Sequence, residues 1–248
     1  MNAHTVSRRQ AFIEFVVSAS NRSMMIGAAA LALTLPVFTQ NAEMQQKLAA
    51  VKQSLVLNKQ KLQKYQWYET TQLNLKGDDK PATQNLCQYA PDGTVLKTPI
   101  GPPPPPPSGG RLKQKIVANK KAEMQDYMGD VKGLLSLYVP PNPQKMDLAY
   151  QAGHFFLNPV GGKMNLVFTD YAQPGDKMSI TFDPASKKIT AMNVSTYMGE
   201  AKDIVTLDVL MSSLPDGTNF VLKTVLNATA KKLVVTTTNS NYQKVGGL

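Results

Sequence analysis

The chain has 248 residues, of which 42% are hydrophobic, 18% charged and 7% aromatic. This balance excludes collagen-like, coiled-coil-only and wholly disordered proteins. One cysteine and two histidines exclude an intramolecular disulfide framework and an all-cysteine zinc site, and leave little for a histidine-based centre. The formal net charge is +10, but the lysines are dispersed in pairs with few aromatic residues between them. That pattern is typical of a solvated surface, and we predict no nucleic-acid partner.

The N-terminal region has the order of a secretory signal. Three arginines precede the uncharged run Met24–Phe38, and small or polar residues follow it. As a helix this run would span about 22 Å, which is less than the roughly 30 Å of a hydrocarbon core. We therefore predict that residues 1–42 are a signal peptide cleaved near Ala42, with an uncleaved N-terminal anchor as the alternative. Export of a chain without paired cysteines favours a bacterial periplasm or exterior.

A helix and a three-stranded meander are predicted next. Residues 43–64 carry one apolar stripe, formed by Met44, Leu48, Val51, Leu55 and Leu62, which predicts a helix that lies on another element. From residue 66 the period changes to two. Strands are predicted over Gln66–Leu75, where Glu69 interrupts the apolar face, and over Thr83–Tyr89 and Thr94–Pro99. Turn residues separate the three strands, so they should pair in an antiparallel way.

Residues 101–110 read GPPPPPPSGG and must be a stiff, extended loop, because consecutive prolines adopt polyproline II and donate no backbone hydrogen bonds. This loop is either a simple connection or a docking peptide for a proline-recognising partner. A helix follows over Arg111–Val139 and is stopped by Pro140 and Pro141. A short helix is predicted over Pro143–Ala152, with Asn142 as its N-cap.

The remainder, from His154 to Gln243, alternates as strands and turns. Within Lys188–Met198 the apolar residues change face, which predicts a β-bulge. The helices do not alternate with the strands, which argues against a parallel sheet. We predict an α+β fold in which residues 43–248 form a single domain. Its curved antiparallel sheet, a half-barrel, is covered on one face by two to three helices and preceded by the N-terminal signal segment.

This order of elements resembles a known family. The segment from Asp176 to Ala191, in which one strand ends in Asp-Pro and the next begins with a basic-apolar stretch, looks like the central hairpin of the bacterial lipoprotein-sorting carriers. The likeness covers roughly residues 43–242. Residues 65–71 (YQWYETT), the proline run and residues 138–141 (YVPP) are similar to an uncharacterised family of exported bacterial proteins. The carrier resemblance implies a ligand with acyl chains, held in the concavity of the sheet.

Reactive groups are few. His154 has no predicted nucleophile beside it, Cys87 lies in a strand and is expected to be inert, and Asp170 and Asp176 flank a turn that such residues favour for local hydrogen bonds. No nucleotide-binding, nucleophile-elbow or metal-ligand motif is present in the sequence. We therefore predict that the protein is not an enzyme and takes no metal or other cofactor.

Methionine and phenylalanine residues gather in the predicted strands, and methionine suits irregular apolar pockets. If they share the concave face, they form an apolar cavity for a lipid or acyl-type ligand; the alternative is that the helices fill this face completely. The candidate ligand-binding residues are Met164, Phe168, Met178, Phe182, Met192, Met211 and Phe220.

The leading functional hypothesis is therefore a non-enzymatic periplasmic or secreted protein that binds an apolar ligand between the sheet and the helices. The alternative is an envelope protein-interaction or sensor module with a filled core and an envelope protein as its partner. Membrane contact is expected only through the leader, if the leader is retained.

Overall fold

In the part of the chain that the structure describes, all strands join one antiparallel sheet. The computed structural model describes residues 36–102 and 111–246, so most of the predicted leader and of the proline run lies outside the described residues. The strands follow the order β4-β3-β1-β11-β10-β9-β8-β7-β6-β5, and β2 pairs with β1. The end strands β4 and β5 do not pair with each other, so the sheet is unclosed. The predicted half-barrel is confirmed.

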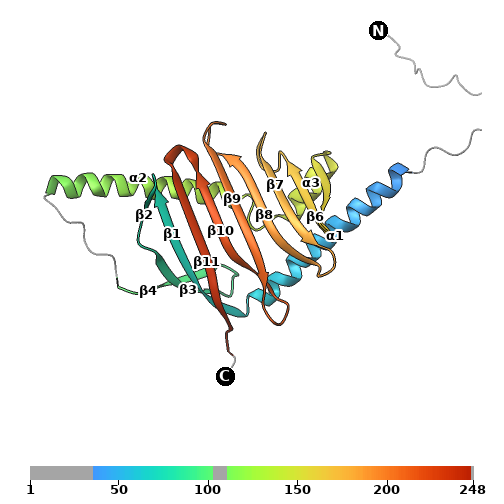
Figure 1. Cartoon of the computed structure of the whole chain (residues 1–248), viewed down its shortest axis with the longest axis horizontal. Coiled ribbons are helices and arrows are strands. Elements are labelled where there is room, and N and C mark those ends of the chain that lie inside the picture. The colour runs from blue at the N-terminus through green and yellow to red at the C-terminus, as the bar shows by residue number, and fades with distance from the viewer. Residues whose placement is uncertain (1–35, 103–110, 247–248) are drawn as a thin grey trace, which may run out of the picture.

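The three α-helices of the described residues lie behind this sheet, on the same face of it (Figure 1). They are α1 (Pro36–Leu62), α2 (Arg111–Leu135) and α3 (Pro143–Gln151). The strands are β1 (Tyr65–Leu75), β2 (Asp78–Asp79), β3 (Thr83–Tyr89), β4 (Val95–Ile100), β5 (Phe155–Val160), β6 (Lys163–Thr169), β7 (Lys177–Asp183), β8 (Lys188–Tyr197), β9 (Ile204–Ser213), β10 (Asn219–Ala228) and β11 (Leu233–Lys244). A 3₁₀ turn, Thr229–Lys231, joins the last two.

The helix ends follow local chemistry. Asn142 caps α3, because its side-chain oxygen accepts hydrogen bonds from the backbone N–H groups of Gln144 at 2.8 Å and Lys145 at 3.3 Å. The α2 helix ends at Leu135, four residues earlier than predicted. Just beyond this end, the N–H groups of Leu137 and Tyr138 donate to carbonyls three positions back, as in a 3₁₀ turn. The α1 helix passes through Ala42, the predicted cleavage position, so the boundary of the leader stays a prediction.

The predicted bulge is found in β8. Thr181 pairs with Ala191 while the next residue, Phe182, pairs with Ile189, so Thr190 is the extra residue on the β8 strand. The bulge keeps apolar side chains on the helix-covered face on both sides of the irregularity. Two further register shifts, in the pairing of β10 with β9 and of β1 with β11, were not predicted.

The residue that interrupts the apolar face of β1 is buried and paired. The Glu69 carboxylate accepts two hydrogen bonds from the Lys97 ammonium of β4, at 2.6 and 2.7 Å. This ion pair explains how a charged residue occupies the inner face of the strand.

Pairing of β1 with the last strand, β11, joins the N-terminal meander to the C-terminal hairpins in one sheet. The apolar core cluster lies between β5–β11 and the three helices.

Candidate apolar ligand site

Most of the seven candidate residues meet in one place. Phe168, Met178, Phe182 and Met192 belong to a single core cluster and are at most 5% exposed. Met164 and Met211 are partly buried against the same cluster. The strand register brings the side chains together, because Phe168 of β6 lies opposite Met178 of β7, and Met164 lies opposite Phe182. Ile180, between them on β7, pairs with Met192 of β8.

Phe220 does not join this cluster. Its ring lies 4.4 Å from the ring of Tyr242, which stacks on Trp67 with an interplanar angle of 10°. Burial raises the pKa of Tyr89 and Tyr242, the latter strongly. The Trp67 indole Nε1 has no hydrogen-bond partner among the described residues. Sequence reasoning missed this second aromatic group, whose members come from strands far apart in the chain: Tyr65, Trp67, Tyr89, Phe220 and Tyr242.

The helices supply the other side of the core cluster. Each of the three places fully or almost fully buried side chains in it: Leu48 and Val51 from α1, Val131 from α2, and Met146 and Ala149 from α3. Because these side chains fill the space over the strands, the described structure is a closed form, in which the candidate residues contact protein groups.

Polar contacts hold α1 in this position. The Lys52 ammonium contacts both carboxylate oxygens of Asp147 on α3, at 2.6 and 2.8 Å. Farther along α1, the Asn58 side-chain amide donates to the backbone carbonyl of Asn219 and accepts from its N–H, both at 2.7 Å. The Ser54 hydroxyl donates to the Lys187 carbonyl at 2.9 Å. These contacts lie at the rim of the core cluster.

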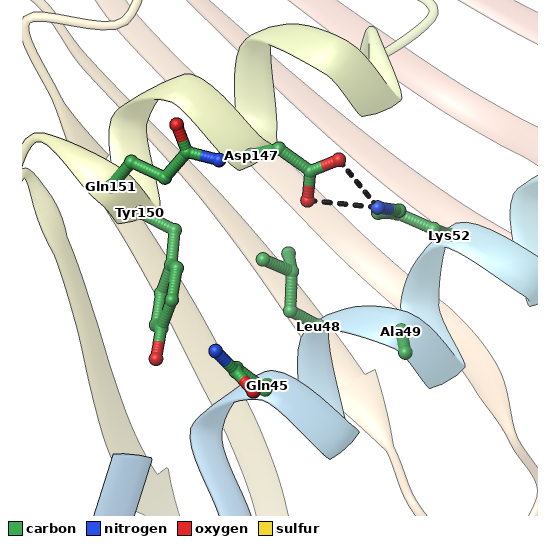
Figure 2. Close-up of a pocket in the computed structure, with 7 residues that line it drawn as sticks. All are labelled: Gln45, Leu48, Ala49, Lys52, Asp147, Tyr150 and Gln151. Carbon is green, nitrogen blue, oxygen red and sulfur yellow. Dashed lines mark hydrogen bonds and ion pairs between the residues drawn. The ribbon is translucent and has the colours of Figure 1, made fainter. Parts of the chain in front are cut away.

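A cavity of about 210 Å³ opens between α1 and α3. Figure 2 shows the Lys52–Asp147 ion pair at one end of it and Tyr150 at the other, with Leu48 between them. The cavity lies on the seam between two helices, and not between the helices and the sheet where the candidate residues were predicted to line it. Its lining combines polar and apolar side chains: Gln45, Leu48, Ala49, Lys52, Asp147, Tyr150 and Gln151.

A buried carboxylate fixes the segment that follows α2. Asp176 is 2% exposed. It accepts backbone N–H groups from Tyr171 at 2.6 Å, Ala172 at 2.9 Å and Gln173 at 2.8 Å, and the Tyr138 hydroxyl at 2.5 Å. Burial, and then the hydrogen bond to Asp176, raise the pKa of Tyr138 strongly. Asp176 therefore anchors this segment to the sheet.

The other candidate reactive groups do not converge. The His154 Nδ1 lies 3.6 Å from an Asp170 oxygen at the surface, and Asp170 also accepts the Gly175 N–H within its own turn. Cys87 is fully buried, and burial followed by the nearby Glu69 charge raises the pKa of its thiol. Such a thiol is a poor nucleophile.

The described residues contain neither a metal-binding cluster nor a membrane-spanning helix. Within residues 36–102 and 111–246, no three histidine, cysteine, aspartate or glutamate side chains are grouped so as to hold a metal ion. Among the helices of that part of the chain, none combines the length and the apolar content needed to cross a bilayer.

No protein-family model matches the chain, and no curated protein matches it in sequence. Among solved structures, a DUF1329 family protein from Desulfovibrio piger ATCC 29098 matches with a TM-score of 0.38 and 11% identity, over 87% of this chain and 95% of its own. A LolA superfamily protein from Nitrosomonas europaea matches with a TM-score of 0.33 and 9% identity, over 79% of this chain and 94% of its own.

Proposed function

We propose that this protein is an exported, non-enzymatic binding protein that holds an apolar, acyl-type ligand between its sheet and its helices. The observation that supports the proposal is the gathering of thioether and aromatic side chains on one continuous helix-covered face. Met164, Met178 and Met192 come from three adjacent strands and meet there with Phe168 and Phe182. Methionine side chains repack easily around a foreign chain because they are unbranched and flexible.

The described closed form is then the ligand-free state. An acyl chain would enter by displacing α1 and would replace the contacts that Leu48 and Val51 make with the sheet. Few polar groups have to separate for this movement, since the Ser54 and Asn58 contacts tie α1 to the sheet and the Lys52 contact ties it to α3. The apolar area that the helix gives up is covered again by the ligand, so the net cost of opening is reduced.

Export is part of the same proposal. The charge pattern of the first 42 residues supports a leader that directs the chain to a bacterial periplasm or exterior. An aqueous compartment between membranes is where a carrier for an insoluble ligand is needed.

The experiment is native mass spectrometry of the chain purified from the periplasm, together with titration by a fluorescent fatty acid. We expect a bound lipid mass, and fatty-acid binding weakened about tenfold in the double variant Met164→Gln/Met211→Gln, which makes two lining side chains polar. Leu148→Gln is the matched control, because Leu148 is 64% exposed on α3. A lipid-free protein that also fails to bind the fluorescent fatty acid would contradict the proposal.

A second function is favoured by one observation, the complete burial of Phe168 and Met178. If the core never opens, the chain is an envelope protein-interaction or sensor module. Its partner would then bind at the surface of the protein, at one of two places. These are the proline run and the edge strand β4, whose six residues are all exposed. Crosslinking in cells should capture a protein partner, and capture should be lost when residues 102–107 are replaced by glycine and serine. Unchanged capture would exclude that run as the contact.

A further inference from the structure

The N-terminal half of α2 leaves the body of the protein. Figure 1 shows α2 running behind the sheet and extending beyond β1 and β2 on the side opposite the N-terminal end of α1. Val131, near the C-terminal end of the helix, is fully buried in the core cluster, and Met124 and Tyr127 are partly buried against it. All side chains from 114 to 123 are exposed. We call residues 111–121 the projecting segment.

The projecting segment is strongly basic. It contains Arg111 and four lysines and no acidic residue. The side chains of Lys115, Lys120 and Lys121 are exposed, and none of them forms an ion pair with another described residue. Their charge is therefore available to an anionic partner, and concentrated on one arm of the molecule.

The same segment exposes apolar side chains between its charges. Ile116 is 49% exposed and Val117 is 41% exposed. At 3.6 residues per turn these two residues flank Lys120 and continue the stripe of Met124 and Val131, which in the second half of the helix packs on the core. The stripe thus begins on the core and runs out into solvent without a protein surface beneath it.

We propose that the projecting segment of α2 docks the protein on the surface of an anionic lipid bilayer. Ile116 and Val117 would sink into the boundary between headgroups and acyl chains, and the Lys120 stem would lie between them with its ammonium among the phosphates. Lys115 and Lys121 add long-range attraction to the negative surface. A nucleic acid would bind the lysines but would not bury Ile116 and Val117. The presence of charged and apolar side chains on the same segment therefore favours a bilayer as the partner.

This inference goes beyond the proposed ligand-binding function. It also departs from the expectation, drawn from the sequence, that the leader is the only contact with a membrane. The projecting segment and the start of α1 lie at opposite sides of the molecule (Figure 1), so docking by α2 does not require a retained leader.

The test is co-sedimentation of the full chain with vesicles of phosphatidylglycerol and phosphatidylcholine, compared with vesicles of phosphatidylcholine alone. We expect binding only to the anionic vesicles. The variant Lys115→Gln/Lys120→Gln/Lys121→Gln should bind them about a hundredfold more weakly, since each lysine near such a surface contributes on the order of 1 kcal/mol. Lys59→Gln/Lys177→Gln/Lys223→Gln is the matched control. It removes the same charge at exposed positions elsewhere, carries the same N-terminus, and should bind like the natural chain.

A second variant separates docking from simple charge attraction. Ile116→Gln/Val117→Gln keeps every lysine, and we expect it to lose about tenfold in binding to anionic vesicles. The proposal is overturned if both lysine variants weaken binding equally, or if the apolar variant binds like the natural chain. It is also overturned if short duplex DNA competes the vesicles away, because that outcome identifies a nucleic-acid surface. Failure here leaves the fatty-acid titration unaffected, so the two proposals stand or fall separately.

Discussion

Replacing Asp176 by alanine should lower the free energy of unfolding by about 4 kcal/mol. The carboxylate is buried and accepts three backbone N–H groups together with the Tyr138 hydroxyl. Alanine leaves three backbone donors without an acceptor in a site from which water is largely excluded, and each unsatisfied donor carries its own desolvation cost. The Tyr138 hydroxyl keeps only its 2.8 Å contact with the Thr196 hydroxyl. Urea unfolding followed by circular dichroism measures the difference.

The size of this effect depends on burial, which gives a matched control. Asp208 is exposed on β9 and accepts one hydrogen bond, from the Asn193 side chain at 2.6 Å. Asp208→Ala should lower the free energy of unfolding by no more than about 1 kcal/mol, because water can accept the hydrogen bond from Asn193 in place of the lost carboxylate. Asp176→Asn should fall between the two, since the amide keeps one acceptor oxygen. Equal costs for Asp176→Ala and Asp208→Ala would show that the buried network does not anchor the segment after α2.

Replacing Phe182 by alanine should lower the free energy of unfolding by about 3–5 kcal/mol. Phe182 is 1% exposed and lies opposite Met164 of β6 and Ile189 of β8. Truncation removes a buried ring and leaves a cavity that the two neighbouring strands cannot close, because their positions are fixed by the ladder on both sides. The change is read from the midpoint and slope of the same urea transition.

Phe156→Ala is the matched control, because Phe156 is 51% exposed on the edge strand β5. We expect it to change stability by less than about 0.5 kcal/mol. If Phe182→Ala were equally mild, the helix-covered face would not be a closed core in solution, and the ligand-free state described above would be wrong.

The sequence predicted the architecture well because each element carries its own periodicity. The alternation of β6 and β7 predicted which residues share the inner face, and the change of face within Lys188–Met198 predicted the bulge at Thr190. Asn142 and Pro143 predicted the start of α3. These are local signals, and local signals survive folding when the tertiary structure agrees with them.

The site was harder to predict because it depends on contacts between distant segments. Alternation places Phe220 on a strand but does not reveal that its ring packs on Tyr242, which in turn stacks on Trp67. Nor does a stripe on α1 reveal how completely Val51 fills the space above the sheet. In the sequence, Glu69 only interrupts the apolar face of a strand. The pairing of β3 with β4 brings Lys97 close enough to form a hydrogen bond with its carboxylate.

The central claim is that an acyl ligand enters beneath α1, and a reversible lock on that helix tests it most directly. Ser54 on α1 and Lys187 at the β7–β8 turn are joined by a 2.9 Å hydrogen bond at the surface. The double variant Ser54→Cys/Lys187→Cys places two thiols at this contact, so a disulfide formed there on oxidation, verified by mass spectrometry, would tie α1 to the sheet, while Cys87 remains buried. We predict that the oxidised protein binds the fluorescent fatty acid at least about tenfold more weakly than the reduced protein, and that reduction restores binding. Equal affinity in the two states would contradict entry beneath α1.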